Sequence, residues 1–298
     1  MITNICKTGL VIIGLVVSGT SLMGQLPASD IYLCNVKWNQ KNILINKPVL
    51  LSSFNADKYN NQPYFEDYQN IYVTSGDSNN KTDIVKLNLF DREYFYLTKT
   101  EGISEFSPQL TPDKTSISVV RIEKDGITQT LWSYPLDRSN HGINMLPNLR
   151  NVGYHVWIDT KMVALFLVDS LPKLALADIE KGSVSVIQNG IGRCLKCKNG
   201  YLFFTVKGED GRHALKKYNI RDLSIEEVAV LPEKTEDFEV LTNGNIIFAN
   251  GGKIKMLNVS TFPPQTSLVC NLEDYGIKNI NRLVSERDRI VVVNLKTK

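Results

Sequence analysis

The sequence is poor in histidine and lacks the motifs of the common hydrolases and nucleotide-binding enzymes. It has three histidines in 298 residues, and none belongs to a His-Glu-x-x-His pair, so zinc hydrolase chemistry has no ligand set. There is no Gly-x-Ser-x-Gly elbow and no glycine-rich loop that could cradle a phosphate. These absences argue against the best-known catalytic classes and direct attention to architecture.

The chain also lacks an excess of charge of either sign. Lysine and arginine number 34 against 31 aspartates and glutamates, which gives a formal net charge of +3. Nucleic-acid binding usually needs a concentrated positive field. We therefore expect no nucleic-acid partner.

Cysteine is scarce as well. Besides Cys6, near the N-terminus, the chain has Cys34, Cys194, Cys197 and Cys270. The spacing of Cys194 and Cys197 is that of redox and zinc motifs, but no second pair and no nearby histidine accompanies it. Residues three apart in an alternating strand point to opposite faces of the sheet. We interpret the four as structural thiols, with a disulfide or a metal site as the alternatives.

A long apolar run is found at the N-terminus. The stretch from Gly9 to Val17 follows Lys7 and precedes small and polar residues, which is the layout of a secretory signal peptide. The run is too short to span a bilayer comfortably. We expect residues 1–24 to be cleaved, with a retained anchor as the alternative. The mature protein would be periplasmic or secreted, without a transmembrane segment.

A short pattern recurs six times along the chain. It consists of a polar lead-in, an apolar anchor, a tight turn and an apolar strand, as in SEFSPQLTPDKTSISVV at 104–120. The anchors are 38 to 47 residues apart: Phe65, Leu110, Trp157, Leu195, Val240 and Leu283.

A second pair of short strands separates one copy from the next. The stretch 172–188, PKLALADIEKGSVSVIQ, alternates on both sides of a Glu-Lys-Gly-Ser turn and predicts a hairpin. Four short strands in about 40 to 45 residues match one propeller blade. No long amphipathic helix is evident, so the predicted fold class is all-β.

The two ends each supply half a blade. The last copy has two strands before Lys298, whereas the stretches at 30–36 and 46–54 read as a third and a fourth strand without a first and a second. We therefore predict one domain, residues 25–298, folded as a six-bladed β-propeller of four-stranded blades. A blade shared between the termini closes the ring and leaves no open edge at the seam.

The repeats resemble those of TolB-like propellers, whose units read Pro-x-Phe-Ser-Pro-Asp-Gly before an apolar strand. Pro108, Pro112 and Asp113 match this pattern, and the preceding copy keeps Pro63, Phe65 and Asp67. The resemblance is specific over residues 59–138. The motifs VGYHVWID and IGRCL are in addition similar to a group of exported TolB-like proteins of Gram-negative bacteria.

This resemblance implies the propeller fold and interaction work in the periplasm or at the surface. TolB carries an α/β domain ahead of its propeller, and we expect this chain to have no room for one. A role in the Tol envelope system therefore does not follow from the resemblance, since propellers host many unrelated functions.

The lead-ins of the inner strands supply the candidate binding residues. In GYHVWID, Tyr154 and His155 could present an aromatic face and an imidazole to a ligand in the central channel. Alternatively, Trp157 fills the space between sheets while His155 bonds a neighbouring strand. The other candidates for the channel mouth are Gln62, Glu105, Arg193, Asp237 and Asn281.

We expect a monomeric, non-enzymatic protein that binds another protein of the envelope or extracellular space. No cofactor is expected, although carboxylates such as Glu105 and Asp237 could bind calcium or act as acid and base. The alternative function is therefore a channel-centred binder of a cation or small ligand. It includes a calcium-dependent lactonase, a lyase or another glycan-active enzyme.

Overall fold

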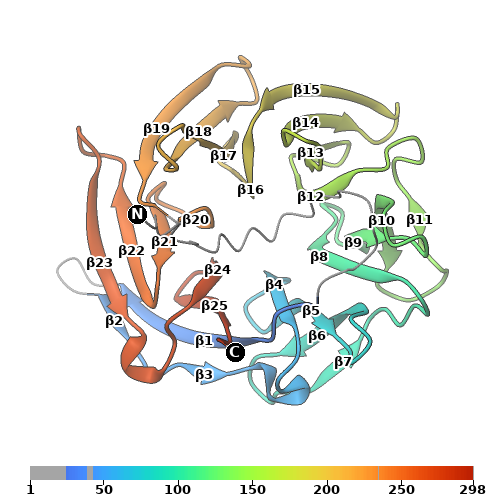
Figure 1. The fold of residues 1–298 in the computed structure, drawn as a ribbon, viewed down its shortest axis with the longest axis horizontal. Coiled ribbons are helices and arrows are strands. Elements are labelled where there is room, and N and C mark those ends of the chain that lie inside the picture. The colour runs from blue at the N-terminus through green and yellow to red at the C-terminus, as the bar shows by residue number, and fades with distance from the viewer. Residues whose placement is uncertain (1–24, 39–42, 234, 298) are drawn as a thin grey trace, which may run out of the picture.

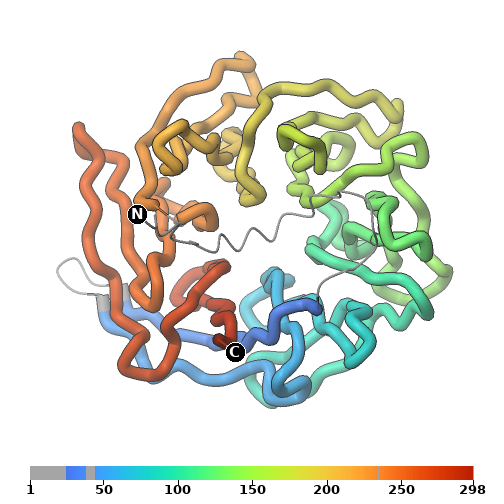
Figure 2. The backbone as a smooth tube through the Cα atoms, viewed as in Figure 1, coloured from blue at the N-terminus to red at the C-terminus, as the bar shows by residue number. Residues whose placement is uncertain are grey.

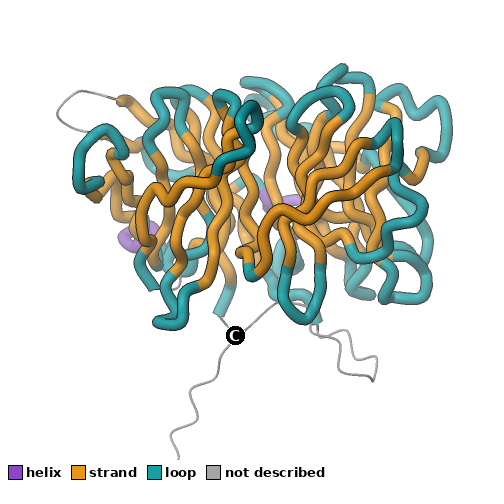
Figure 3. Tube along the Cα trace, turned by 90° about the horizontal axis from the view of Figure 1, so that it is seen from above, coloured by secondary structure: helices purple, strands orange, loops and turns teal. Residues whose placement is uncertain are grey.

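The computed structural model describes residues 25–38, 43–233 and 235–297 and shows a ring of six antiparallel sheets (Figure 1). The sheets are arranged as blades around a central axis, and the backbone makes one circuit of the ring (Figure 2). Strands stand between two faces of loops and turns (Figure 3). The predicted six-bladed all-β propeller is confirmed. The predicted signal peptide lies outside the described residues.

Blades 1 to 3 follow each other along the chain, and each begins with the strand nearest the axis. Their strands are β4 (Asn60–Phe65), β5 (Asn70–Gly76), β6 (Thr82–Asn88) and β7 (Tyr94–Tyr96); β8 (Ser104–Leu110), β9 (Ser116–Ile122), β10 (Gln129–Pro135) and β11 (Ile143–Asn144); β12 (Val152–Trp157), β13 (Met162–Leu167), β14 (Lys173–Asp178) and β15 (Ser183–Asn189).

Blades 4 and 5 continue in the same order. Their strands are β16 (Ile191–Lys198), β17 (Tyr201–Lys207), β18 (His213–Asn219) and β19 (Ile225–Leu231); β20 (Phe238–Val240), β21 (Ile246–Asn250), β22 (Lys253–Asn258) and β23 (Gln265–Asn271). A short 3₁₀ helix, η2 (Glu273–Tyr275), leads to blade 6.

Blade 6 joins the two ends of the chain, as the sequence predicts. Its inner strands are β24 (Ile280–Glu286) and β25 (Arg289–Leu295), and β25 pairs with β1 (Ser29–Trp38) from Ser29 to Asn35. The blue and red ribbons consequently lie side by side (Figure 1). The N-terminal segment therefore supplies the third strand of the last sheet and covers the edge of β25.

The outermost strand of blade 6 differs from the prediction. The single strand expected at 46–54 is wrong, because two short strands, β2 (Ile43–Ile45) and β3 (Val49–Leu50), both pair with β1. Pro48 stands between them and has no N–H for a strand ladder. The chain then enters the 3₁₀ helix η1 (Ser52–Asn55).

An acidic side chain closes the turn between the first and second strands of blades 1 to 3. Asp67 Oδ1 accepts hydrogen bonds from the backbone N–H groups of Gln69 and Asn70. Asp113 does the same for Thr115, and Asp159 for Lys161 and Met162. Such aspartate turns explain why the Pro-Asp signal marks the hairpin between β8 and β9.

The core consists of apolar layers between and within the blades. One cluster joins Cys34 of β1 to Val292 of β25 and to Ile254 and Cys270 of blade 5, so it packs the shared blade against its neighbour. The four cysteines among the described residues are free thiols. Burial raises the pKa of Cys34 to about 12 and that of Cys270 to about 11, which keeps both protonated.

The described part of the chain contains no helix with the length and apolar character needed to cross a membrane.

Candidate functional site

The central channel brings together four of the predicted site residues. Arg193, Asp237 and Asn281 line one pocket of about 130 Å³ between blades 4, 5 and 6. Tyr154 of blade 3 reaches the same group, because its hydroxyl accepts a 2.9 Å hydrogen bond from Arg282 Nη2. Blades 3 and 6 stand opposite each other in the ring (Figure 1). This hydrogen bond therefore links the two sides of the channel.

Arg282, which the sequence analysis did not select, is the centre of this group. Its side chain is 13% exposed, and its Nη1 lies 3.5 Å from Asp237 Oδ2. Its guanidinium carbon lies 5.0 Å from the centroid of the Tyr154 ring. A largely buried guanidinium is stabilised when a carboxylate, an oxygen acceptor and an aromatic face surround it.

Arg193 also lines this pocket and is held by blades 5 and 6. Its backbone N–H donates to Glu236 Oε1 over 2.8 Å, and its Nη2 donates to the carbonyl of Asn281 over 3.2 Å. Its Nε lies 3.6 Å from Glu236 Oε2. Two arginines and two acids thus face the pocket, and the pocket is close to electrically neutral.

A second polar layer lies further along the inner strands. Lys196 Nζ of β16 lies 2.7 Å from Glu239 Oε2 of β20, which pairs the charges of blades 4 and 5. Gln109 Nε2 of β8 donates to the backbone carbonyl of His155 over 2.5 Å. The channel wall is consequently joined by polar contacts between neighbouring blades.

His155 does not present its imidazole to the channel. The residue is 2% exposed, and its Nε2 lies 2.7 Å from Ser118 Oγ on the neighbouring blade. Ser118 Oγ donates to the carbonyl of Gln109 and accepts from Trp157 Nε1, so the network assigns a proton to His155 Nε2. Burial lowers the pKa of His155 to about 3. The structure therefore agrees with the second interpretation of the motif GYHVWID, in which His155 bonds a neighbouring strand.

Gln62 and Glu105 are also built into the walls between blades. Gln62 Oε1 accepts hydrogen bonds from Thr74 Oγ1 and from the backbone N–H of Ser107. Glu105 is fully buried, and its Oε1 accepts from Thr100 Oγ1 and the Tyr134 hydroxyl. Burial, with help from the nearby Asp83 charge, raises the pKa of Glu105 to about 7. The sequence places Gln62 and Glu105 at the channel mouth, whereas the structure buries both side chains in the walls between blades. Ligand binding by any of the seven candidate residues stays a prediction.

Breaks in the strand register explain the difference. Five of the described inner strands (β4, β8, β12, β16 and β24) shift register along their length. Gln62 and Ser107 have φ values of 52° and 54°, in the left-handed region. A bulge re-aims the side chains around it, so simple alternation misassigns which residue faces the axis. The lead-in residues selected from the sequence do not include Arg282 or Glu236, which also line the pocket.

Across residues 25–38, 43–233 and 235–297, no three histidine, cysteine, aspartate or glutamate side chains form a group able to hold a metal ion. Asp237 and Glu105, suggested as a calcium or acid–base pair, lie in different surroundings. Asp237 Oδ1 accepts from the backbone N–H of Leu283, whereas Glu105 is enclosed by threonine and tyrosine hydroxyls. The calcium alternative stays a prediction.

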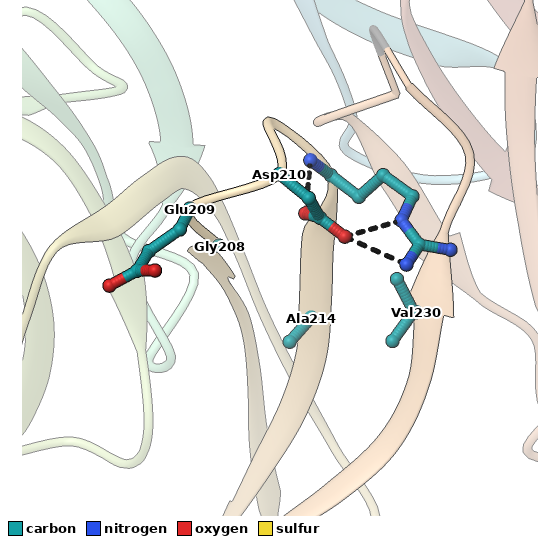
Figure 4. Close-up of a pocket in the computed structure, with 6 residues that line it drawn as sticks. Gly208, Glu209, Asp210, Ala214 and Val230 are labelled. Carbon is teal, nitrogen blue, oxygen red and sulfur yellow. Dashed lines mark hydrogen bonds and ion pairs between the residues drawn. The ribbon is translucent and has the colours of Figure 1, made fainter.

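A further pocket, of about 370 Å³, lies on the outer part of blade 4 (Figure 4). Its charged side chains include Asp210 and Arg212, which pair with each other over 2.7 Å. Ala214 and Val230 form its apolar side. The pocket shows no convergence of unpaired polar groups from several blades.

The outer hairpin of blade 1 carries a group of exposed aromatic side chains, which we call the blade 1 rim. The rim consists of Phe90, Tyr94, Phe95 and Tyr96, with exposed fractions of 58%, 45%, 46% and 40%. Tyr94 stacks on Phe54 with ring centroids 4.5 Å apart, and Arg138 of blade 2 lies 5.0 Å from the Phe95 centroid. Tyr94 and Tyr96 share one face of β7 and Phe95 lies on the other, so the rim exposes aromatic rings on both faces of this outer strand.

No family model matches the sequence, and no curated protein matches it. Among solved structures, a putative TolB from Agrobacterium tumefaciens superposes with a TM-score of 0.64 at 12% identity, covering 91% of this chain and 99% of that one. TolB from Acinetobacter baumannii gives 0.60 at 12% identity, with 91% of this chain and 65% of that chain covered. The fold is that of a TolB-like propeller.

Other proteins share the TolB-like propeller fold. The nidogen/laminin complex superposes with a TM-score of 0.60 at 9% identity, covering 91% of this chain and all of the matched one. Oligogalacturonate lyase from Vibrio parahaemolyticus gives 0.51 at 13% identity, over 90% and 98% of the two chains. At these identities the comparisons show the fold alone.

Proposed function

We propose that this chain is an exported, non-enzymatic propeller that binds another protein of the envelope or extracellular space. In this proposal residues 1–24 are a cleaved signal peptide, and the mature protein is a monomer in the periplasm or outside the cell. The ring provides a rigid support, and the outer hairpins and loops provide the binding surface.

The observation that carries the proposal is the blade 1 rim. Tyrosine, phenylalanine and arginine are enriched in the centres of protein interfaces, and the rim combines three of its rings with neighbouring Arg138 and Phe54. Tyr94 contacts both Phe54 and Tyr96, and Arg138 lies over the Phe95 ring, which reduces the conformational entropy lost on binding. A protein partner would therefore meet a preorganised apolar surface.

The structures that share the fold agree with a binding role. TolB-like propellers are among them, and so is the nidogen/laminin complex, which is an assembly of two proteins. These likenesses support the proposal through the fold, whereas the choice of surface depends on the exposed rings of blade 1.

The test is capture of a partner by variants of the rim. The tagged protein would be incubated with the envelope fraction of its source organism, and the captured proteins would be compared between wild type, Phe95→Ala and Phe262→Ala. Phe262 is a fully exposed phenylalanine of blade 5 and serves as the matched control. We expect Phe95→Ala to lose a partner that Phe262→Ala retains. Equal capture by all three proteins would count against the rim.

The channel pocket favours a second candidate, a binder of a small ligand or an enzyme acting there. Arg193, Asp237 and Asn281 converge on it, and oligogalacturonate lyase shares the fold. At about 130 Å³ the pocket is smaller than the roughly 300–1,000 Å³ of usual ligand sites. Calorimetry with calcium and a panel of sugars tests this candidate. Heat that disappears in Arg193→Gln would favour the channel over the rim.

A further inference from the structure

Two carboxyl groups, which we call the acid pair, hold one short segment between blades 1 and 2. Asp83 belongs to β6 of blade 1 and Glu105 to β8 of blade 2. The Thr98 hydroxyl oxygen lies 3.5 Å from Asp83 Oδ1 and 3.4 Å from Glu105 Oε2. Thr100 donates its backbone N–H to Asp83 Oδ1 over 3.1 Å and its hydroxyl to Glu105 Oε1 over 2.5 Å. Both acids therefore contact the same segment, residues 97–103, which we call the strap.

The Thr98 hydroxyl has one hydrogen and cannot donate it to both acids. Its oxygen already accepts from the backbone N–H of Ile84 over 2.8 Å. When Glu105 Oε2 carries a proton, it can donate that proton to the hydroxyl, and the hydroxyl can donate to Asp83, so each group has a partner. When Glu105 is ionised, a single hydrogen faces two buried carboxylates, and one of them loses this bond.

On the blade 2 side, the cation that faces Glu105 is paired with another acid. Arg121 lies opposite Glu105 in the register of β8 and β9, and its Nε and Nη2 lie 3.1 and 3.0 Å from Glu123 Oε2. Its Nη1 donates to the Tyr134 hydroxyl over 3.3 Å, and that hydroxyl donates to Glu105 Oε1 over 3.2 Å. Because Oε1 accepts from both Tyr134 and the strap, the proton of a neutral Glu105 belongs on Oε2.

On the blade 1 side, the neighbouring charge is also negative. Burial raises the pKa of Asp83, and the charge of Asp77 raises it further. Lys99 and Glu101 of the strap are exposed, so water screens their charges. Burial, with a smaller effect of the Asp83 charge, raises the pKa of Glu105 to about 7. The acid pair therefore keeps one proton below about pH 7 and loses it above that pH.

The strap joins the acid pair to the blade 1 rim. It begins at Leu97, directly after β7, and the Leu97 N–H donates to the carbonyl of Ile84 over 2.7 Å. Arg138 of blade 2 donates to the carbonyl of Tyr96 over 2.8 Å and lies over the Phe95 ring. The arrangement of the rim therefore depends on how blades 1 and 2 lie against each other, and the acid pair lies at that same junction.

We propose that the acid pair is a pH-sensitive switch that controls partner binding at the blade 1 rim. With one proton on the pair, both acids hold the strap, and the rim keeps the arrangement that binds the partner. After loss of the proton, repulsion between the two carboxylates releases Thr98 and Thr100, and the affinity for the partner falls. Binding is consequently tighter at acidic than at alkaline pH. This inference rests on the proposed function, because it regulates the rim as the binding surface.

The switch itself is measured on the purified protein without a partner. Hydrogen–deuterium exchange of the strap would be followed at pH 6 and at pH 8, with the rates corrected for the intrinsic effect of pH on exchange. Between these pH values a group with a pKa of about 7 passes from about one-tenth to about nine-tenths ionised. We therefore expect the protection of the strap to fall about tenfold, in proportion to the population of the released state.

Three variants assign the effect to the acid pair. Glu105→Gln cannot ionise, so its strap should be equally protected at both pH values. Asp83→Asn removes a charge that raises the pKa of Glu105, so the loss of protection should move to lower pH; this variant keeps the test open if Glu105→Gln does not fold. Glu101→Gln, an exposed acid of the same strap, is the matched control and should behave as wild type. Equal protection of the wild-type strap at both pH values, or a fall that persists in Glu105→Gln, overturns the inference.

Envelope capture at pH 6 and pH 8 separates failure of this inference from failure of the proposed function. We expect wild type to bind its partner about tenfold more weakly at pH 8, and Glu105→Gln to bind equally at both pH values. If Phe95→Ala loses a partner that wild type binds equally at both pH values, the proposed function stands and the switch is wrong. A loss at pH 8 that Glu105→Gln shares belongs to the partner and also overturns the switch. If Phe95→Ala captures the same proteins as wild type, the rim is not the binding surface and both proposals fail.

Discussion

The channel wall and the blade 1 rim differ in how far their side chains are satisfied within the protein: the charged groups of the channel are paired, whereas the aromatic rings of the rim are exposed. In the channel, Arg282 has both Asp237 and the Tyr154 hydroxyl, and Lys196 has Glu239. At the rim, Tyr94, Phe95 and Tyr96 are exposed. The channel contacts join blades within the ring, whereas the rim presents aromatic rings to the outside.

This contrast separates residues that stabilise the ring from residues that are available for recognition. A group whose partners come from other blades contributes to folding, and a ligand must compete with those partners. A group without an internal partner lowers stability and gains most when a ligand supplies one. Stability and partner binding should therefore respond to different mutations.

The largest effect is expected from removal of the N-terminal strands. Deletion of residues 25–54 takes away β1, β2 and β3 and exposes the whole edge of β25. We expect the ring to lose cooperative unfolding, as followed by circular dichroism on heating, because one sheet is left with two of its five strands. Undiminished cooperative melting of the deleted protein would refute closure through a shared blade.

The second-largest effect on the free energy of unfolding is expected from breaking the ion pair of Arg282 in the channel. Arg282→Leu leaves Asp237 largely buried without its cation and removes the hydrogen bond to Tyr154. Breaking a buried ion pair on one side costs about 3–5 kcal/mol of unfolding free energy. Urea denaturation measures it, with Arg221→Leu on the exposed turn of blade 4 as control, for which we expect a change within about 0.5 kcal/mol. A loss as small as that of the control would show that the channel contacts do not hold the ring.

Glu105 gives the wall between blades 1 and 2 a pH dependence. Its folded-state pKa of about 7 lies above the ordinary value of 4.5, so the folded protein binds the proton more tightly than the unfolded chain. Stability from this group is full below pH 4.5 and is lost as the pH rises towards 7. The loss is on the order of 3 kcal/mol.

The matched variant is Glu105→Gln, which cannot ionise. Its unfolding free energy should equal or exceed that of wild type at pH 8, and the difference between the two proteins should shrink or reverse at pH 5. Denaturation curves at both pH values check this. A difference between the proteins that is independent of pH would show that Glu105 is ionised throughout.

The smallest effect on stability is expected at the rim. Phe95 is 46% exposed, so Phe95→Ala should change the unfolding free energy by less than about 1 kcal/mol. The same variant is expected to lose the captured partner. A large loss of stability would mean that the rim supports the ring and would remove the contrast with the channel.

The blade count and the closing seam could be predicted because both depend on local signals that repeat. Turn residues such as Asp67, Asp113 and Asp159 mark the inner hairpins of blades 1 to 3, and the half blade at each end leaves one arrangement that closes the ring. The split outer strand of blade 6 could not be predicted, because the apolar residues around Pro48 resemble one continuous strand, whereas Pro48 lies between β2 and β3.

The channel was predictable only in part, for a geometrical reason. Tyr154, Arg193, Asp237 and Asn281 do lie around it, but His155, Gln62 and Glu105 point into the walls. Bulges near the starts of the inner strands change the side-chain alternation, and sequence alone does not place a bulge. The rim depends on exposure of three consecutive aromatic residues, which a strand pattern normally buries on at least one face.

The most direct test of the account is hydrogen–deuterium exchange of the protein alone and in complex with its captured partner. We expect new protection in residues 88–96, which carry the blade 1 rim. Exchange along the inner strands near Arg193, Asp237 and Arg282 should stay as in the free protein. Protection confined to those channel segments, with residues 88–96 unchanged, would contradict it.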